Sequence, residues 1–403
     1  MELRRGGWGQ LPRAMNKKLT CGHRSSGGCF LWAGRLIAAG ALSLNVLGLW
    51  AQTSTPSDAA QDSQPIQKRA ALSQADISRI RSKADAGDAA AQVELGRAYR
   101  DGNGVAQNDQ LAAEWYRRAA DQGDAAAQNE VGNLYRLGRG VSQNKEEAVR
   151  WYAKAAKNGN AIGMFNLGTC YYNGDGVPPD EFTAYAWFLL AQDGGDKAAD
   201  DAVQRSSAPM SPKEKADAFI QIAQWYEEGK ELPHDDAKSL RWLQMAAPLT
   251  PQAKVRLATH LVNEPQPEKY YGAALDACKK AAEEKYPPGV FCVGYMYRKG
   301  WGVPQDAAEA LKWYAKAAAY NNPAALMESA QMYATGDGTT VDRVQAFLLL
   351  LTATQIGVQG ARQKATELFA SMDKNEIKRV EGKLRGKRLD PKKVLALFKA
   401  PQS

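Results

Sequence analysis

The sequence predicts an all-α fold, in which stacked antiparallel helix hairpins form an α-solenoid that winds as a right-handed superhelix. One stretch, GVAQNDQLAAEWYRRAADQG at 104–123, recurs in related form at 140–159, 176–195 and 302–321. In every copy the interval from the Gly of Gly-Val to the Trp is the same, which gives Trp115, Trp151, Trp187 and Trp313. A fixed period of this length is typical of stacked repeats, whose units contact mainly their neighbours.

The first 51 residues have the composition of an export signal. A basic start precedes the apolar segment CFLWAGRLIAAGALSLNVLGLWA at 29–51, and a polar run follows it. The short uninterrupted apolar core favours a signal peptide cleaved after Ala51, whereas the whole segment is long enough for an uncleaved membrane anchor. Met15 is an alternative start to Met1. With either start we expect the repeats outside the cytoplasm, exported to the periplasm or the extracellular space.

The net charge of +8 does not indicate a nucleic-acid partner. The leader holds seven basic residues and one acidic residue, so the remainder of the chain is nearly balanced. Residues 52–72, rich in Gln, Ser, Asp, Ala and Pro, bury too little apolar surface to fold and are predicted to be a disordered linker. Ser73 can then cap a helix within 73–87, which we expect to cap the array.

The first full unit, residues 88–123, contains two short amphipathic segments joined by a Gly-containing turn, the pattern of an antiparallel helix hairpin. Small residues recur within the units. Ala112 and its counterparts allow close helix approach, and the Trp three positions later fills the space between hairpins. A Gly inside each first helix, such as Gly96 or Gly132, costs about 1 kcal/mol against Ala. We expect close helix packing to offset that cost.

The pattern Ala, Leu-Gly, Tyr, Gly-x-Gly-Val and Ala-x-x-Trp-Tyr-x-x-Ala-Ala resembles the Sel1-like repeat, a relative of the tetratricopeptide repeat. The resemblance is close at 85–195 and 287–320. It predicts repeats 1 to 3 at 88–195, an insertion and degenerate repeats at 196–284, and further repeats at 285–357. The insertion at 196–215 predicts a bend or break that could divide the stack into two sub-arrays. The leader and this resemblance together suggest a bacterial protein.

The tail at 358–403 is predicted to form C-terminal capping helices that end in a basic segment. Such a segment either contacts an anionic surface or is the solvated face of a docked helix. Outside the leader the chain has three cysteines, and Cys278 and Cys292 could pair because they lie on successive predicted helices. The alternative is that all three are small buried hydrophobic residues.

No catalytic residue, metal site or cofactor is predicted. His234 falls in a predicted turn, and His260 falls late in an apolar helix where a structural role is expected. Neither has Cys or carboxylate neighbours at metal-ligand spacing. The paired acids are expected on solvent-exposed helix ends and turns, namely Glu227-Glu228, Glu283-Glu284 and Asp235-Asp236.

Binding is therefore the favoured function, because a solenoid presents an extended concave surface. The resemblance implies that first helices line that surface. The positions just after the packing Gly and just after the repeated Tyr should then face a partner, and they hold Arg97, Arg100, Asn133, Arg136, Tyr172, Tyr295 and Arg298. Arginines in such a groove suit an acidic peptide or a cell-envelope glycan. Alternatively, they are ordinary helix-end residues favoured by the helix dipole.

Two function classes follow. The first is a non-enzymatic scaffold in the cell envelope, as the resemblance to Sel1-like proteins implies, which binds a protein or peptide. The second is an envelope enzyme acting on peptidoglycan or a β-lactam, an activity attributed to relatives with disulfide-stapled repeats. The lack of paired cysteines in each repeat argues against the second class.

Overall fold

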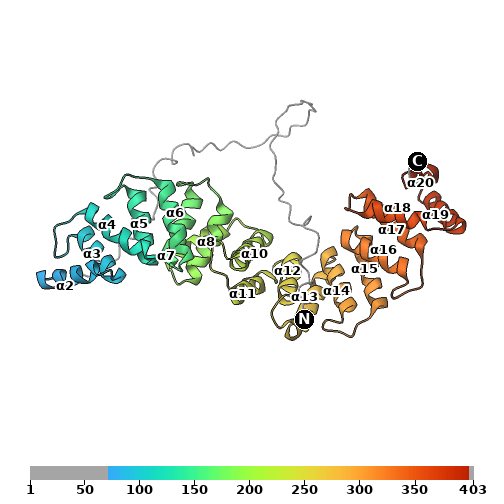
Figure 1. Cartoon of the computed structure of the whole chain (residues 1–403), viewed down its shortest axis with the longest axis horizontal. Helices are drawn as coiled ribbons and strands as arrows, with labels where there is room; N and C mark the ends of the chain where they lie inside the picture. The colour runs from blue at the N-terminus through green and yellow to red at the C-terminus, as the bar shows by residue number, and fades with distance from the viewer. Residues whose placement is uncertain (1–70, 399–403) are drawn as a thin grey trace, which may run out of the picture.

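The computed structural model describes residues 71–398 and confirms the predicted all-α solenoid of stacked antiparallel hairpins. The predicted leader (1–51) and all but the end of the predicted linker (52–72) lie outside these residues. Figure 1 shows the hairpins following one another along the long axis, from α2 at one end to α20 at the other. No helix between residues 71 and 398 is both long and apolar enough to span a membrane.

Within the described residues, seven hairpins each consist of a first and a second helix. Hairpins 1 to 3 are formed by α3 (Ala89–Asp101), α4 (Asp109–Asp121), α5 (Ala125–Leu137), α6 (Lys145–Lys157), α7 (Ala161–Asn173) and α8 (Glu181–Asp193). Hairpins 4 and 5 are formed by α10 (Pro212–Glu228), α11 (Asp236–Ala246), α12 (Pro251–Leu261) and α13 (Tyr271–Glu283). Hairpins 6 and 7 are formed by α14 (Pro287–Lys299), α15 (Ala307–Ala319), α16 (Pro323–Thr335) and α17 (Arg343–Gln355).

The remaining helices lie before, between and after the hairpins. They are α2 (Gln74–Asp85), α9 (Ala198–Ser207), the 3-10 helix η3 (Pro267–Lys269), α18 (Ala361–Ala370), α19 (Lys374–Gly386) and α20 (Pro391–Ala396). Ser73 caps α2 in a capping box with Asp76. Leu72, just before this cap, is half-buried and donates its N–H to Asn103 Oδ1 at 2.9 Å, so α2 is fastened to the first turn of the array.

The turn inside each regular hairpin depends on two glycines. The first, such as Gly138, ends the first helix in the left-handed conformation with φ 71°. The second packs against the start of the preceding second helix. A Cβ built on Gly302 would lie 2.7 Å from the carbonyl oxygen of Tyr271, the first residue of α13. The repeated Gly-x-Gly therefore both turns the chain and joins neighbouring hairpins.

In hairpins 1, 2, 3 and 6, a glycine inside the first helix faces an aromatic ring of its own hairpin. A Cβ on Gly132 would lie 2.6 Å from the Tyr152 ring. The same pairing occurs at Gly96 with Tyr116, Gly168 with Phe188, and Gly294 with Tyr314. Hairpins 4, 5 and 7 have a different pair in the same positions, namely Ala223 with Leu243, Ala258 with Cys278, and Ala330 with Leu350. Glycine thus accompanies an aromatic partner, and alanine accompanies a smaller one. This is the close packing expected from the recurring glycine.

A buried polar bridge links helices in the first two hairpins. The Gln128 side chain donates from Nε2 to the Ala120 carbonyl of the preceding second helix at 3.1 Å. Its Oε1 accepts from Nδ2 of Asn158, the C-cap of α6, at 2.9 Å. Gln92 and Gln122 form the equivalent contact in hairpin 1 at 2.8 Å. These amides satisfy polar groups where three helix ends meet.

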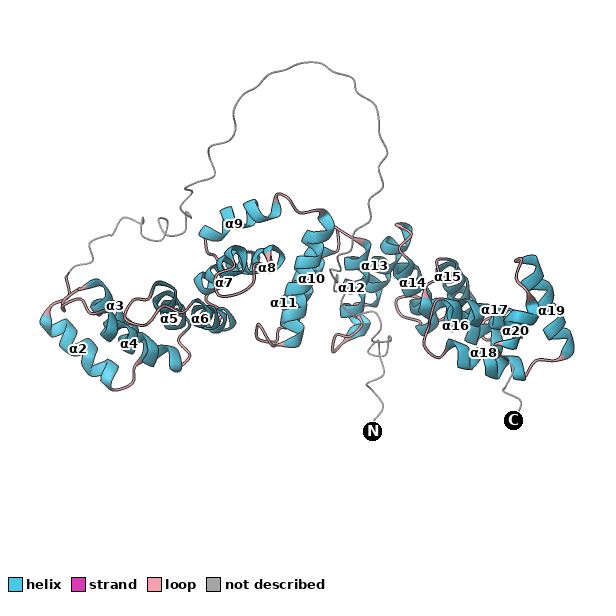
Figure 2. Ribbon diagram, turned by 90° about the horizontal axis from the view of Figure 1, so that it is seen from above, coloured by secondary structure: helices cyan, strands magenta, loops and turns pink. Residues whose placement is uncertain are grey.

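The insertion at 196–215 does not separate the stack. It adds α9, which packs on α8, and the array then resumes with α10, which also contacts α8 (Figure 2). Trp187 of α8 stacks on Trp225 of α10 with ring centroids 4.7 Å apart. One hydrophobic cluster runs from Ala148 to Leu243 across the insertion, so the structure shows one continuous array at this point.

The C-terminal helices close the far end of the core. Val380, Leu384 and Leu395 are buried in a cluster shared with Phe347 of α17. The Lys and Arg side chains between them are exposed. The basic residues therefore lie on the solvated face of docked helices.

A disulfide joins Cys278 of α13 to Cys292 of α14, whose Cα atoms lie 5.6 Å apart. Both cysteines are buried, and the bond connects hairpin 5 to hairpin 6. Cys170, the remaining described cysteine, is free and buried, and burial raises the pKa of its thiol to about 12.

Removing this bond should weaken the centre of the array. We expect Cys278→Ala with Cys292→Ala to lower the free energy of unfolding by about 2 to 3 kcal/mol, because a short closed loop constrains the unfolded chain. Urea unfolding of the oxidised protein and the variant measures the difference. Cys170→Ala is the control, since it removes a buried thiol without touching the bond. Equal free energies of unfolding for the oxidised protein and the double variant would contradict the prediction.

Candidate partner-binding surface

The first helices lie on the inner side of the curved array. Neighbouring first helices contact each other directly (α5 with α7, α10 with α12, α12 with α14). Among the described residues, neighbouring second helices of the hairpins make no contacts of similar extent. Closer spacing on one side of a stack curves it toward that side. The surface formed by α3, α5 and α7 is therefore the candidate binding surface, which we call the inner surface.

The structure brings five of the seven predicted groove residues onto this inner surface and separates the other two. Arg97 and Arg100 are on α3, Asn133 and Arg136 are on α5, and Tyr172 is on α7. Tyr295 and Arg298 are on α14, with α10 to α13 between (Figure 1). The seven residues therefore do not form a single site.

Among the predicted groove residues, Arg97 has the charge most accessible to a binding partner. Its side chain is half-exposed, and within residues 71–398 its guanidinium forms no ion pair or hydrogen bond. Asn133 and Thr169 occupy the same position on the next two first helices and are also half-exposed. Together they form a polar stripe across α3, α5 and α7.

Arg100 instead connects neighbouring hairpins. Its Nη1 lies 3.1 Å from Glu130 Oε2 on α5, and its Nε donates to Asp101 at 2.8 Å. Arg298 of hairpin 6 forms a similar ion pair with Asp337, which lies in the turn of hairpin 7. Both arginines are half-buried. Their charges are already compensated within the array, which sequence spacing alone did not reveal.

The buried hydroxyl of Tyr152 lies beneath the inner surface and donates to Asn133 Oδ1 at 2.7 Å. Burial raises the pKa of Tyr152, and the nearby Arg136 only partly offsets that effect. Tyr172 is 49% exposed, with its ring centroid 6.4 Å from that of Phe188. It is the largest exposed apolar group among the predicted groove residues. Tyr295, by contrast, is half-buried and packs edge-on against Trp301 at 5.7 Å.

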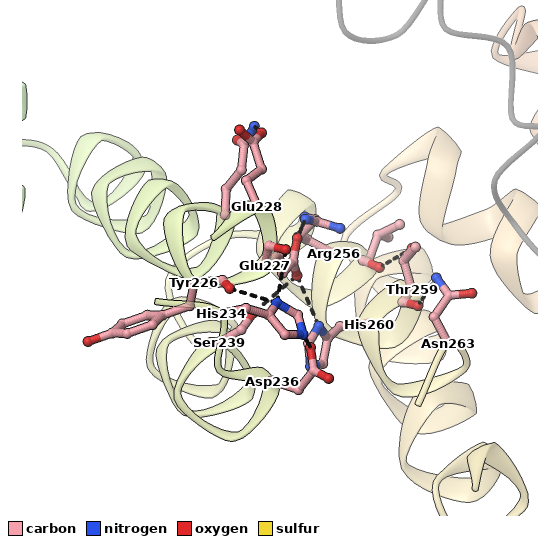
Figure 3. Close-up of polar contacts among 12 residues, drawn as sticks. Tyr226, Glu227, Glu228, His234, Asp236, Ser239, Arg256, Thr259, His260 and Asn263 are labelled. Atoms are coloured by element: carbon pink, nitrogen blue, oxygen red, sulfur yellow. Dashed lines mark hydrogen bonds and ion pairs between the residues drawn. The ribbon is translucent and has the colours of Figure 1, made fainter. Parts of the chain in front are cut away.

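A second polar cluster lies farther along, between α10 and α12 (Figure 3). Glu227 Oε1 accepts from His260 Nδ1 at 2.9 Å and from Ser239 Oγ at 3.1 Å, and Oε2 pairs with Arg256. The other His260 nitrogen, Nε2, lies 3.0 Å from Glu264, outside hydrogen-bond geometry. Burial raises the pKa of Glu227, but the His260 hydrogen bond and the Arg256 charge outweigh it, so the net pKa is lowered.

The expectation that Glu227 lies on a solvent face is wrong, because only 22% of its side chain is exposed. Its neighbour Glu228 is directed away from the cluster (Figure 3) and pairs with Lys230. His234 is exposed in its turn, where Asp236 raises its pKa. His260 is buried, as its apolar helix predicted. Sequence reasoning missed its carboxylate partners because they lie on another helix and in the following turn.

Glu227 and Arg256 correspond in position to Arg100 and Glu130. The first residue of each pair comes two before a helix-ending glycine, at Gly229 and Gly102. The second residue of each pair is the sixth after its N-cap, at Thr250 and Asp124. The same joint between first helices is therefore made with opposite polarity in the two places.

Comparisons with known proteins identify the repeat. The sequence profile of the Sel1 repeat matches residues 89–124, 125–160, 161–196, 216–247, 292–321 and 323–357. Hairpin 5, whose packing pair is Ala258 with Cys278, falls between these matches. A comparison with curated proteins found no match to the sequence.

Two solved structures are similar to this chain. One is a protective antigen present in uropathogenic Escherichia coli strains and displaying an SLR fold, at 24% identity over 81% of this chain and 75% of that chain, with a TM-score of 0.39. The other is a Sel1 repeat protein from Oxalobacter formigenes, at 26% identity over 72% of this chain and 79% of that chain, with a TM-score of 0.34.

Proposed function

The chain belongs to the Sel1 repeat family, and from this premise we propose that it is an exported scaffold that binds a protein or peptide partner on its inner surface. Sel1 repeat proteins are typically non-catalytic scaffolds and generally mediate protein–protein interactions. The observation that carries the proposal is the stripe of Arg97, Asn133 and Thr169 at one position of three successive first helices. This repeated position stays polar and half-exposed, whereas the packing residues beside it are buried. Asn133 Oδ1 already accepts from Tyr152, so its amide nitrogen and the guanidinium of Arg97 are the donors left for a partner.

The stripe also suggests the chemistry of the partner. Arg97 offers a forked donor for a carboxylate at one end, and Tyr172 offers an exposed ring at the other. An extended acidic peptide with an apolar residue farther along fits both ends. Export to the cell envelope is proposed from the basic and apolar leader, which precedes the described residues. An acidic glycan of the envelope would use the same arginine and is the alternative partner.

The test compares two charge reversals of equal size. Full-length protein carrying Arg97→Glu is cross-linked in intact cells, and the partner yield is compared with that of the wild type. Arg150→Glu is the matched control, because Arg150 is exposed on α6, a second helix, away from the inner surface. We expect Arg97→Glu to reduce the cross-linked partner about tenfold, as loss of one charged hydrogen bond would. Arg150→Glu should have no effect.

Equal partner yields from the two variants would remove the inner surface from consideration. The enzymatic alternative has its own readout, hydrolysis of a chromogenic β-lactam or of a cell-wall preparation by the full-length protein. Hydrolysis that persists after purification to homogeneity would replace the scaffold proposal.

A further inference from the structure

A second surface feature lies on the opposite side of the array from the inner surface, between the second helices α13 and α15. It is a hollow of about 480 Å³ with Val290 of α14 among its lining residues. Its apolar lining comprises Ala282, Val290, Trp313, Ala319 and Tyr320. Three charged residues, Lys279, Glu283 and Lys316, complete the lining.

The polar bridge that joins these positions in hairpins 1 and 2 is absent at the hollow. Val290 and Tyr320 occupy the positions of Gln128 and Asn158, whose amides join in hairpin 2. Hairpin 5 fills the same two positions with an ion pair, Lys254 with Glu284 at 2.7 Å. A valine cannot form either bridge. Tyr320 is therefore left 50% exposed at the edge of the hollow.

The tryptophan of this hairpin is also less covered than its counterpart. Trp151 in hairpin 2 is 1% exposed, with Arg117 at 4.8 Å and Lys154 at 3.8 Å from its ring. Trp313 has Lys316 at 4.2 Å and is only half-buried. Lys279 stands on α13 where Arg117 stands on α4, but does not cover the ring. An aromatic wall therefore faces the hollow.

We propose that this hollow is a docking site for a peptide segment of a partner protein that carries a large apolar side chain beside carboxylates. The apolar walls accept the side chain. Lys279 and Lys316 outnumber Glu283 and form no ion pair within residues 71–398, so a carboxylate of the peptide complements them. A hollow of this size accepts one or two side chains. The area that they would bury is far smaller than the area buried in a stable dimer interface. The site is independent of the inner surface.

The test uses the full-length protein and three synthetic peptides in calorimetric titrations. The first peptide has one Phe flanked by Glu in a Gly/Ser background, the second has Lys in place of Glu, and the third has Ser in place of Phe. We expect the Phe/Glu peptide to bind at least tenfold more tightly than either control. We expect Val290→Gln with Tyr320→Asn to weaken that binding about tenfold, because the introduced amides rebuild the bridge of hairpin 2.

Single substitutions keep the test valid if the double variant fails to fold. Tyr320→Asn alone should weaken binding. Ile356→Asn should leave it unchanged, because Ile356 is the C-cap of the second helix in the next hairpin and is 44% exposed, against 50% for Tyr320. Arg97→Glu should also leave it unchanged, which separates this site from the inner surface. Equal binding of all three peptides, or equal effects of Tyr320→Asn and Ile356→Asn, would overturn the proposal. Concentration-dependent dimerisation in sedimentation velocity that Tyr320→Asn abolishes would instead assign the hollow to a second copy of the chain.

Discussion

Replacing Gly132 with alanine is expected to destabilise hairpin 2 by about 1 to 3 kcal/mol, although alanine is the better helix former by about 1 kcal/mol. The new Cβ would lie 2.6 Å from the ring of Tyr152. That ring cannot move away easily, because it is fully buried and its hydroxyl is held by Asn133. Hydrogen exchange of the α5 and α6 amides measures the local loss, since repeat arrays need not unfold in one step.

Two further variants make this result specific. Gly132→Ala with Tyr152→Leu reproduces the Ala330 and Leu350 pair of hairpin 7, so the double variant should be more stable than the sum of the single effects by at least about 1 kcal/mol. Gly382→Ala is the matched control, because Gly382 lies inside α19 and a Cβ there meets no atom within 4 Å. It should stabilise α19 slightly. If Gly132→Ala destabilised its helix no more than Gly382→Ala does, the inference that glycine is required opposite the aromatic ring would be contradicted.

Reversing the charge of Glu227 is expected to loosen the joint between hairpins 4 and 5 by about 2 to 3 kcal/mol. An arginine there would face Arg256 and lose the hydrogen bond from His260. Breaking a buried ion pair costs about 3 to 5 kcal/mol, and partial exposure of this pair reduces that value. Faster hydrogen exchange in α10 and α12, without a change in α3 and α5, would show that the effect is local.

The neighbouring glutamate supplies the control. Glu228→Arg makes the same charge change at a carboxylate directed away from the cluster, and it should leave exchange in α12 unchanged. Glu227→Arg with Arg256→Glu restores an ion pair in the polarity of Arg100 and Glu130. It should recover part of the loss, though not the His260 hydrogen bond. No recovery would mean that the pair does not hold the two first helices together.

The sequence was sufficient to predict the hairpins, since Gly-x-Gly-Val and the Trp recur at fixed intervals wherever the repeat is regular. It was less informative in the middle of the chain. In hairpin 5, Ala258 replaces the glycine and Cys278 replaces the aromatic residue. The repeat pattern is therefore lost in the sequence, although the two residues still pack in one buried cluster. Only the paired positions in space show that the unit is preserved.

The candidate sites were harder to predict for a related reason. The position after the repeated Tyr was expected to face a partner, yet Arg100 reaches a neighbouring first helix and pairs with Glu130. Glu227 was missed because its partners lie about thirty residues away, on a helix with no repeat signature. The outer hollow lies where Val290 and Tyr320 replace the two amides of hairpin 2, and that replacement is visible only by comparison with hairpin 2.

The opposite polarity of the two joints also limits how this array could change length. If recombination joined hairpin 1 directly to hairpin 5, Arg100 would meet Arg256 and two like charges would share one half-buried contact. Joining hairpin 4 to hairpin 2 would bring Glu227 against Glu130. Units of similar shape are thus not interchangeable, and the charges at their joints favour the present order over shortened or shuffled versions of the same array.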